Sequence, residues 1–437
     1  MKSLRIGPIA RVAGTVELPG SKSLSNRVLL LAALARGTTE VRNLLDSDDV
    51  SHMRAALKTL GVETSVSENR RRCIVRGQGG PFASRSAELF LGNAGTAMRP
   101  LAAALCLGNG AFILRGDARM HERPIGDLVT ALRSAGAAID YLGEPGFPPL
   151  QIHAHGLRGG SIRIEGGTSS QFLSALLMAA PLAEEASVIE LTGTLVSKPY
   201  VEMTCAVMRR FGAVIETPAP GVYRVPGRQS YTSIDAFAVE GDASSASYFL
   251  AAAAISGGTV RVEGIGTSAT QGDVRFVDVL ERMGAVVRRS DDWLEVTGTG
   301  HLEGVEIDGR DIPDAAMTAA TTALFANGTT RIRGVANWRV KETDRIAAMA
   351  HELRKLGASV TEHEDGLEIS PPAQLKPATI DTYNDHRMAM SFSLAALGDV
   401  TIEINDPGCT SKTFPDYFET LIRLATPLSR DAYSAQP

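Results

Sequence analysis

Lys22-Ser23-Leu24-Ser25-Asn26-Arg27 opens an Ala- and Leu-rich stretch typical of a helix, and the chain repeats this arrangement six times. Each stretch begins with a polar or charged cluster, continues for several helical turns, and then meets a Gly/Thr turn and a β-rich run. The five later openings are Asn93-Ala94-Gly95-Thr96, Ser169-Ser170-Gln171, Asp242-Ala243-Ser244, Asp314-Ala315-Ala316 and Asp385-His386-Arg387. The period is roughly 70–75 residues, so each copy should be a small subdomain rather than one hairpin.

Each copy has a second half, in which a polar loop precedes another helix that ends in a glycine turn. The ends of these helices are Leu60-Gly61-Val62, Ala135-Gly136-Ala137, Phe211-Gly212-Ala213, Met283-Gly284-Ala285 and Leu356-Gly357-Ala358. Glycine suits the left-handed conformation that closes a helix before a strand resumes. The sixth copy stops at its helix, around Tyr417 to Leu424. The pattern predicts an α/β protein of six repeated βαβαββ-like units.

The length and the turn-rich segments predict how the repeats divide. A chain of 437 residues suggests at least two domains, and three repeats in each is the natural division. The stretch from Gly221 to Ser233 is rich in turn-forming residues and separates the third copy from the fourth. We therefore expect the chain to cross between domains just before Asp242. The tail from Thr426 to Pro437 has no apolar periodicity, and we expect it to be frayed.

Composition excludes several classes of protein. The hydrophobic fraction of 44% and the charged fraction of 21% are ordinary for a globular protein. A net charge of −5 without a basic block disfavours nucleic acid as the main partner. The N-terminus lacks a signal-peptide core, and no apolar run approaches the length that spans a membrane. The four cysteines show no paired spacing, which predicts reduced thiols in a cytoplasmic protein.

Cations at the helix openings predict an anion site. Lys22, Ser23 and Arg27 lie at the head of the first helix, where free backbone N–H groups attract phosphate or carboxylate. A Ser N-cap with two solvated cations is the alternative, which this segment taken alone favours. Further cations recur in the loops or first turns of other copies: Arg123, Lys198, Lys341, Arg345, Arg387 and Lys412, with Arg99 and Arg339 close by. This recurrence in an acidic protein favours positive potential focused on one cleft.

Other polar residues allow two interpretations. Asp242, Asp314 and Asp385 each open a helix, and an N-cap role explains all three. Glu342, between Lys341 and Arg345, is either a surface ion-pair residue or a general acid/base in an anion pocket. His386 is either a donor to substrate or a helix-start residue. The loop Gly92-Asn93-Ala94-Gly95-Thr96 either cradles phosphate or is a structural turn.

Taken together, the motifs of all six copies resemble the 5-enolpyruvylshikimate-3-phosphate synthase family, from about Leu4 to Leu424. They are Pro19-Gly20-Ser21-Lys22-Ser23, Leu91-Gly92-Asn93-Ala94-Gly95-Thr96-Ala97-Met98-Arg99-Pro100, Arg123-Pro124-Ile125, Ser169-Ser170-Gln171-Phe172, Val196-Ser197-Lys198-Pro199-Tyr200, Gly241-Asp242-Ala243-Ser244, Ile312-Pro313-Asp314, Lys341-Glu342-Thr343-Asp344-Arg345 and Asp385-His386-Arg387-Met388. The Gly-Asn-Ala-Gly-Thr-Ala-Met-Arg-Pro form resembles the glyphosate-sensitive class.

This resemblance implies an inside-out α/β architecture of two three-repeat domains, with helices inside and sheets outside. The N-terminal domain would span residues 21–239, and the C-terminal domain residues 240–437 together with 1–20. The active site would lie in the cleft between them. The implied reaction transfers the enolpyruvyl group of phosphoenolpyruvate to the 5-hydroxyl of shikimate 3-phosphate and releases phosphate. The resemblance also implies a cytoplasmic monomer that needs no metal and no cofactor and is inhibited by glyphosate.

The family's functional residues transfer position by position. Those that would hold shikimate 3-phosphate are Lys22, Ser23, Arg27, Ser169, Ser170, Gln171, Ser197, Tyr200, Asp314, Asn337 and Lys341. Those that would hold phosphoenolpyruvate are Lys22, Asn93, Gly95, Arg123, Gln171, Arg345, His386, Arg387 and Lys412. The implied catalytic residues are Asp314, which would accept the 5-hydroxyl proton, Glu342, which would protonate the vinyl methylene, and Lys22. The sequence does not decide which of these three moves which proton.

Two alternatives come from different classes. The enolpyruvyl transferase of the same fold that acts on UDP-N-acetylglucosamine carries a reactive cysteine just before its Arg-Pro, whereas Arg115 to Arg123 contains none. A non-catalytic anion-binding protein would also need a basic cleft. The carboxylates Asp314 and Glu342 count against that second alternative.

Overall fold

A computed structural model describes residues 2–428 and 433–436, and the chain forms two compact units. One unit comprises Gly20–Val239, and the other comprises Met1–Pro19 with Glu240–Pro437. Each unit has its own hydrophobic core, built from the inner helices and the inward faces of its sheets. None of the helices in the described part of the chain is both long enough and apolar enough to cross a membrane.

Two repeats of the first unit, residues 20–239, are continuous in sequence. The second repeat runs β7 (Ser86–Phe90), α3 (Gly95–Leu105), β8 (Asn109–Arg115), α4 (Gly126–Ser134), β9 (Ala138–Tyr141) and β10 (Leu150–His155). The third runs β11 (Gly160–Glu165), α5 (Ser170–Ala179), β12 (Ser187–Thr192), α6 (Lys198–Arg210), β13 (Glu216–Ala219) and β14 (Val222–Val225). Their sheets have the orders β7-β8-β10-β9 and β11-β12-β14-β13. Both are the predicted βαβαββ units.

The first repeat takes one strand from the end of its unit. It comprises α1 (Lys22–Leu34), β4 (Arg36–Arg42), α2 (Asp48–Thr59), β5 (Glu63–Val66) and β6 (Arg72–Gln78). Its edge strand is β15 (Ala236–Ala238), which pairs in parallel with β4 and gives the order β15-β4-β6-β5. The strand just before the crossing at Val239 thus completes the first sheet.

The other unit has the same sheet order in three repeats. The fourth repeat contains β3 (Gly14–Glu17), α7 (Ala243–Ser256), β16 (Thr259–Glu263), α8 (Phe276–Arg282), β17 (Val286–Arg289) and β18 (Trp293–Thr297). The fifth contains β20 (Glu306–Asp308), α9 (Ala316–Thr322), β22 (Thr330–Arg333), α10 (Arg345–Lys355), β23 (Ser359–His363) and β24 (Gly366–Ser370). The sixth contains β25 (Ala378–Ile380), α11 (His386–Ser393), β26 (Ile402–Asn405) and α12 (Tyr417–Leu424).

Both ends of the chain supply strands to this second unit. The sixth copy stops at its helix as predicted, and β1 (Ser3–Ile6) and β28 (Tyr433–Gln436) fill the two missing positions in the order β25-β26-β1-β28. A small ladder also joins β2 (Ile9–Val12) to β27 (Ala425–Pro427), and another joins β19 (Leu302–Glu303) to β21 (Ala326–Asn327). The prediction of a frayed tail is therefore wrong for residues 426–427 and 433–436, because backbone pairing orders them. Residues 429–432 and 437 lie outside the described part.

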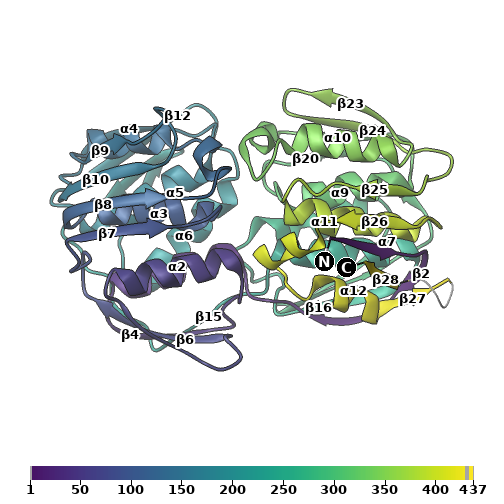
Figure 1. Cartoon of the computed structure of the whole chain (residues 1–437), viewed down its shortest axis with the longest axis horizontal. Helices are drawn as coiled ribbons and strands as arrows, with labels where there is room; N and C mark the ends of the chain where they lie inside the picture. Colours follow the sequence, from purple (N-terminus) through teal and green to yellow (C-terminus); the bar gives the residue numbers. More distant parts are fainter. Residues whose placement is uncertain (1, 429–432, 437) are drawn as a thin grey trace. The chain divides into compact units, whose positions relative to one another are not determined.

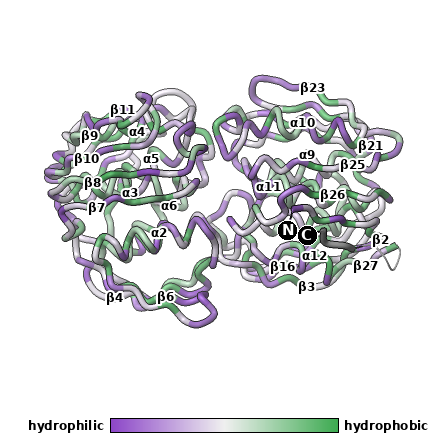
Figure 2. The backbone as a smooth tube through the Cα atoms, viewed as in Figure 1, coloured by the Kyte–Doolittle hydropathy of each residue, from purple (hydrophilic) through white to green (hydrophobic). Residues whose placement is uncertain are grey.

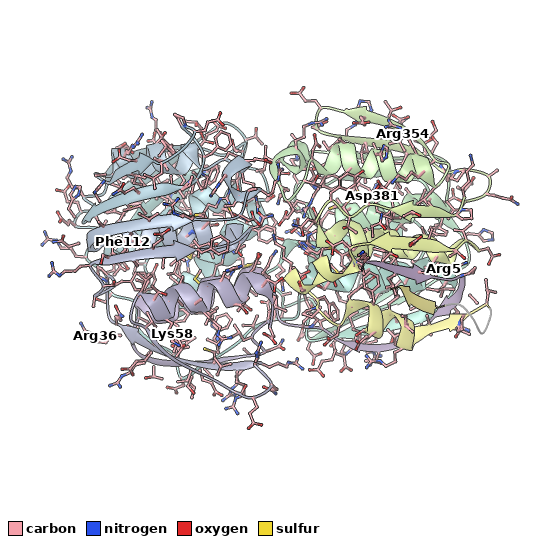
Figure 3. The ribbon with its side chains drawn as sticks, viewed as in Figure 1. Arg5, Arg36, Lys58, Phe112, Arg354 and Asp381 are labelled. Carbon is pink, nitrogen blue, oxygen red and sulfur yellow. The ribbon has the colours of Figure 1, made fainter. Side chains whose placement is uncertain are left out.

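The first helix of each repeat fills the interior of its unit, because most of its residues are small or apolar and nearly all are buried. Every residue of α3 is buried, and in α1 only Ser23 is not. In the first unit, α3 packs against α5 on one side and against β8 and β10 on the other (Figure 1). Phe112 of β8, labelled in Figure 3, is 1% exposed and belongs to this core, whereas the labelled Arg36 is exposed. The turn at Glu364 between β23 and β24 is hydrophilic, as a surface hairpin requires (Figure 2).

Local signals set the ends of these helices. The five glycines predicted to end a helix all have positive φ: Gly61, Gly136, Gly212, Gly284 and Gly357. Gly20, the first residue of the first unit, must be glycine for a different reason. A Cβ there would lie 1.9 Å from the carbonyl oxygen of Asn43, so only glycine permits this approach of two backbones. The head of α1 follows directly.

Candidate active site

Arg27 is the centre of a polar cluster inside the first unit. It projects from the second turn of α1 and is 4% exposed. Its guanidinium donates to the hydroxyl of Thr204 on α6 at 2.7 Å, to the carbonyl of Ser23 at 2.9 Å and to the hydroxyl of Ser174 on α5 at 3.4 Å. All three acceptors are neutral, and burial lowers the pKa of Arg27 from 12.5 to about 10. A buried cation with neutral partners is suited to bind an incoming anion.

Lys22 lies one turn before Arg27, in the first turn of the same helix. Its ammonium is 3.4 Å from the carboxylate of Asp49, which α2 contributes, and Lys22 is only 7% exposed. The N-cap position belongs to Ser21, whose side chain makes no capping bond. The interpretation of Ser23 as an N-cap beside two solvated cations is therefore wrong, since Ser23 is inside the helix and both cations are buried.

Gly95, Arg123 and Gln171 converge from the second and third repeats. Gly95 is the first residue of α3, and a Cβ built on it would lie 3.0 Å from both Arg123 Nη2 and Gln171 Oε1, and 2.8 Å from Arg99 Nη1. The guanidinium of Arg123 also donates to the side-chain oxygen of Asn93 at 2.7 Å. Two guanidinium donors, one amide oxygen and a helix N-terminus without a side-chain cap thus meet at one point. We call Lys22, Arg27, Gly95, Arg123 and Gln171 the first cluster.

The serines predicted to bind substrate lie at two neighbouring helix starts. Ser169 caps α5 by accepting from the N–H of Gln171 at 3.2 Å, and Ser170 begins that helix. Ser197 precedes α6 with φ of 53°, a strained conformation for a residue other than glycine. Tyr200, in the first turn of α6, accepts at its carbonyl from the Thr204 hydroxyl that contacts Arg27. These helix starts therefore connect to the first cluster.

Asp314 is the centre of a second cluster, in the other unit. Its carboxylate is 2.9 Å from Arg387, 3.0 Å from Arg345 and 3.8 Å from Lys341. Burial alone would raise the pKa of this carboxyl, but the three cations together hold it well below its usual range. The N-cap interpretation is wrong for Asp314, because α9 begins two residues later and its side chain faces cations instead. Asp242 and Asp385 do cap α7 and α11.

Glu342 and Arg345 extend this second cluster. Glu342 is 3.0 Å from Arg345 and 3.5 Å from Lys412, and its side chain is 9% exposed. Arg345 is held from its other side by the buried carboxylate of Asp385 at 2.7 Å. Although burial opposes it, these carboxylates raise the pKa of Arg345 further above its ordinary value. We call Asp314, Glu342, Arg345, Arg387 and Lys412 the second cluster.

The remaining predicted residues of this unit lie on the same elements. His386 is the fully buried first residue of α11, directly before Arg387. Asn337 is buried in the 3-10 turn Ala336–Val340, four residues before Lys341. Trp338 in that turn donates from its indole to the carbonyl of Pro313 at 2.6 Å and so fixes the residue that precedes Asp314.

The structure shows which of the recurring cations are buried and adds two carboxylate partners that the sequence did not indicate. Lys198 and Arg339 recur at the expected positions, but they pair with Glu202 and Asp344 in partly or largely exposed ion pairs. Asp49 and Asp385, by contrast, are buried partners of Lys22 and Arg345. Asp49 lies in the first turn of α2 and Asp385 caps α11, and neither position gives a sign in the sequence that the carboxylate binds a cation. All four cysteines are free, as predicted, and the structure buries all four.

Comparisons with known proteins agree along nearly the whole chain. The family model described as EPSP synthase (3-phosphoshikimate 1-carboxyvinyltransferase) matches residues 6–421. The 3-phosphoshikimate 1-carboxyvinyltransferase of Tolumonas auensis is 62% identical over 419 residues, which cover 96% of this chain and 98% of that protein. The enzyme of the same name from Klebsiella pneumoniae strain 342 is 60% identical over 427 residues, 98% of this chain and 100% of that protein.

A solved structure shares the fold. An EPSP synthase from Acinetobacter baumannii matches with a TM-score of 0.79 at 28% identity, covering 98% of this chain and 99% of that one. The enolpyruvyl transferase NikO from Streptomyces tendae reaches the same TM-score at 21% identity, which shows the fold alone.

Proposed function

The chain belongs to the EPSP synthase family and transfers the enolpyruvyl group of phosphoenolpyruvate to shikimate 3-phosphate, and we propose that its two clusters divide this work. The first cluster binds the anionic groups of the substrates, and the second supplies the carboxylates that move protons. The observation that carries this division is the different set of partners around the arginines of the two clusters. Arg27 has neutral acceptors, whereas Arg345 and Arg387 contact carboxylates.

Shikimate 3-phosphate is assigned to the helix starts around Arg27. Its phosphate and carboxylate would be met by Ser23, Arg27, Ser169, Ser170 and Ser197, because hydroxyls, guanidinium groups and helix N-termini are the donors that anions prefer. Tyr200 would lie along its ring. From the second unit, Asn337 and Lys341 would complete the set. Burial lowers the pKa of Lys341, and Asp314 opposes this effect, so an arriving anion would strengthen its charged form.

Phosphoenolpyruvate is assigned to the convergence at Gly95 and to the cations of the second cluster. Lys22, Asn93, Arg123 and Gln171 would hold it from the first unit. Arg345, His386, Arg387 and Lys412 would hold it from the second. Glyphosate also carries a carboxylate and a phosphorus-centred anion, and we propose that it competes with phosphoenolpyruvate for these groups.

Asp314 is proposed as the base and Glu342 as the acid, with Lys22 assisting. Asp314 takes the proton from the 5-hydroxyl as that oxygen bonds to C2 of phosphoenolpyruvate, and Glu342 delivers a proton to the methylene carbon. The resulting ketal then loses phosphate and the methyl proton. Since three cations hold Asp314 ionised, it is ready to accept a proton. Substrate anions that bind to those cations would weaken their hold and make Asp314 a stronger base.

The test is phosphate release with both substrates present. We expect release only with shikimate 3-phosphate and phosphoenolpyruvate together, and none with either alone or with UDP-N-acetylglucosamine in place of shikimate 3-phosphate. Asp314→Ala should abolish most of the release while still binding shikimate 3-phosphate in a calorimeter. Binding by the unmodified protein without release would contradict the catalytic assignment. We also propose a cytoplasmic monomer, which gel filtration of the purified protein tests in part.

A further inference from the structure

A second carboxylate is buried beside Asp314 and belongs to neither cluster. Asp273 lies in the 3-10 turn Gly272–Arg275 and is 3% exposed. One of its oxygens accepts from the hydroxyl of Ser244 on α7, and the other accepts from the backbone N–H of Ala315 at 3.3 Å. Ala315 directly follows Asp314, so Asp273 ties α7 to the peptide that carries the proposed base.

The partners of Asp273 differ in charge from those of Asp314. Asp314 contacts three cations, whereas Asp273 accepts from a hydroxyl and an amide. The charged groups that face Asp273 are Asp314, from the segment before α9, and Arg387 from α11, while α7 contributes the uncharged Ser244. Burial and the negative charge of Asp314 raise the pKa of Asp273 from 3.8 to about 6, although Arg387 and the two hydrogen bonds oppose this shift.

We propose that Asp273 is a positioning residue for Asp314, which it fixes through the Ala315 backbone and strengthens as a base through its own negative charge. The proposal rests on the function of Asp314 proposed above. The influence is mutual, because two neighbouring carboxylates each make the other hold a proton more tightly. An ionised Asp273 therefore counteracts part of the pull that Arg387, Arg345 and Lys341 exert on Asp314, and a base that binds its proton more tightly reacts faster.

This arrangement makes the rate depend on the protonation of Asp273. Below about pH 6 the residue is neutral and Asp314 feels the cations fully. Above that pH the charge of Asp273 opposes them, and catalysis accelerates. The substrates also carry phosphates that ionise near pH 6. Ionisation of the substrates affects the variant and the wild type equally. It therefore cancels when kcat/KM of the variant is divided by kcat/KM of the wild type at each pH.

Asp273→Asn separates charge from geometry. The amide can still accept from Ala315 N–H and can donate to Ser244 Oγ, so the anchor persists while the charge is lost. We expect the ratio of kcat/KM to be near one at pH 5 and to fall about threefold to tenfold by pH 8, with the midpoint near pH 6. Asp273→Ala also loses the anchor, and its kcat should fall about tenfold to a hundredfold at every pH. Calorimetric affinity for shikimate 3-phosphate should change less than twofold in Asp273→Asn.

Asp278→Asn is the matched control, because it is the same substitution five residues later. Asp278 lies on the exposed face of α8, where it pairs with Arg289. Its ratio of variant to wild-type kcat/KM should not change with pH. A flat ratio for Asp273→Asn, or a wild-type kcat for Asp273→Ala, would overturn the proposal. Asp314→Ala is measured in parallel. If that variant keeps its turnover, the base assignment itself is at fault, which distinguishes the two failures.

Discussion

Replacement of Asp314 by alanine should destabilise the second unit and disable turnover together. The carboxylate is 2.9 Å from Arg387, 3.0 Å from Arg345 and 3.8 Å from Lys341, and its side chain is 11% exposed. Loss of one partner from a buried ion pair costs about 3–5 kcal/mol, because the remaining charge is left without compensation. Arg345 retains Asp385 and Glu342, and Arg387 retains the hydroxyl of Tyr248 at 3.3 Å. We therefore expect a loss near the lower end, about 3 kcal/mol.

The assay is thermal unfolding without ligand and with inorganic phosphate. For a unit of roughly 200 residues, 3 kcal/mol corresponds to a fall of about 6–12 °C in the melting temperature of that unit. Phosphate should restore more of the loss in Asp314→Ala than it adds to the wild type, since the released cations bind it and any ligand of the native state stabilises by mass action. Turnover should fall about a hundredfold or more, as for a missing general base.

Asp311→Ala is the control in the same segment. Asp311 pairs with Arg275 at 2.6 Å in an exposed ion pair, which contributes about 1 kcal/mol or less. Its melting temperature and its response to phosphate should match those of the wild type. An unchanged melting temperature in Asp314→Ala would refute the ion-pair argument, and normal turnover would refute the assignment of Asp314 as the base.

Three further predictions each concern one residue. Gly95→Ala places a methyl 2.8 Å from Arg99 and 3.0 Å from Arg123. The inhibition constant of glyphosate should therefore rise at least about tenfold, and by a larger factor than the KM of phosphoenolpyruvate. Equal changes in the two constants would exclude discrimination by size. Arg27→Lys loses the guanidinium that reaches three acceptors, so KM for shikimate 3-phosphate should rise about tenfold or more with a smaller change in kcat, which steady-state kinetics measures. Because the folded state raises the pKa of Asp273 from 3.8 to about 6, stability should fall as pH rises across that interval, and Asp273→Asn should recover about 3 kcal/mol in urea unfolding at pH 8 but not at pH 4.

The sequence predicted well those features that neighbouring residues determine, such as the ends of helices. The five glycines that end helices are recognisable because the left-handed conformation excludes most other residues, and each has positive φ. The helix openings were predictable because polar clusters precede apolar runs. The helix at Asp314 is the exception. It begins at Ala316 because the Asp314 side chain faces three cations and is not available as a cap.

Long-range pairing could not be predicted in the same way. Ser3 pairs with Asn405, and β28 pairs with β1 from the other end of the chain, although neither segment has a marked apolar pattern. The open edge of an incomplete sixth sheet determines these positions, and a local reading of the tail does not reveal that edge. The site shows the same limit: the candidate cations and the carboxylates Asp314 and Glu342 were visible in the sequence, but two buried partners from other helices were not. Lys22 with Asp49 and Arg345 with Asp385 are contacts between separate helices.

The different partners of the arginines explain why one fold, repeated in two units, serves two tasks. In the first unit, neutral oxygens satisfy Arg27 and Arg123, so their positive charge is not cancelled locally and remains available to substrate anions. In the second unit, Arg345 and Arg387 are already opposed by carboxylates, so an arriving anion competes with Asp314 and Glu342 instead of adding to them. Binding there changes the proton affinity of the carboxylates at the moment when a base and an acid are needed. We infer that helix N-termini alone would make two equivalent anion sites, and that the carboxylates of the second unit convert one of them into catalytic machinery.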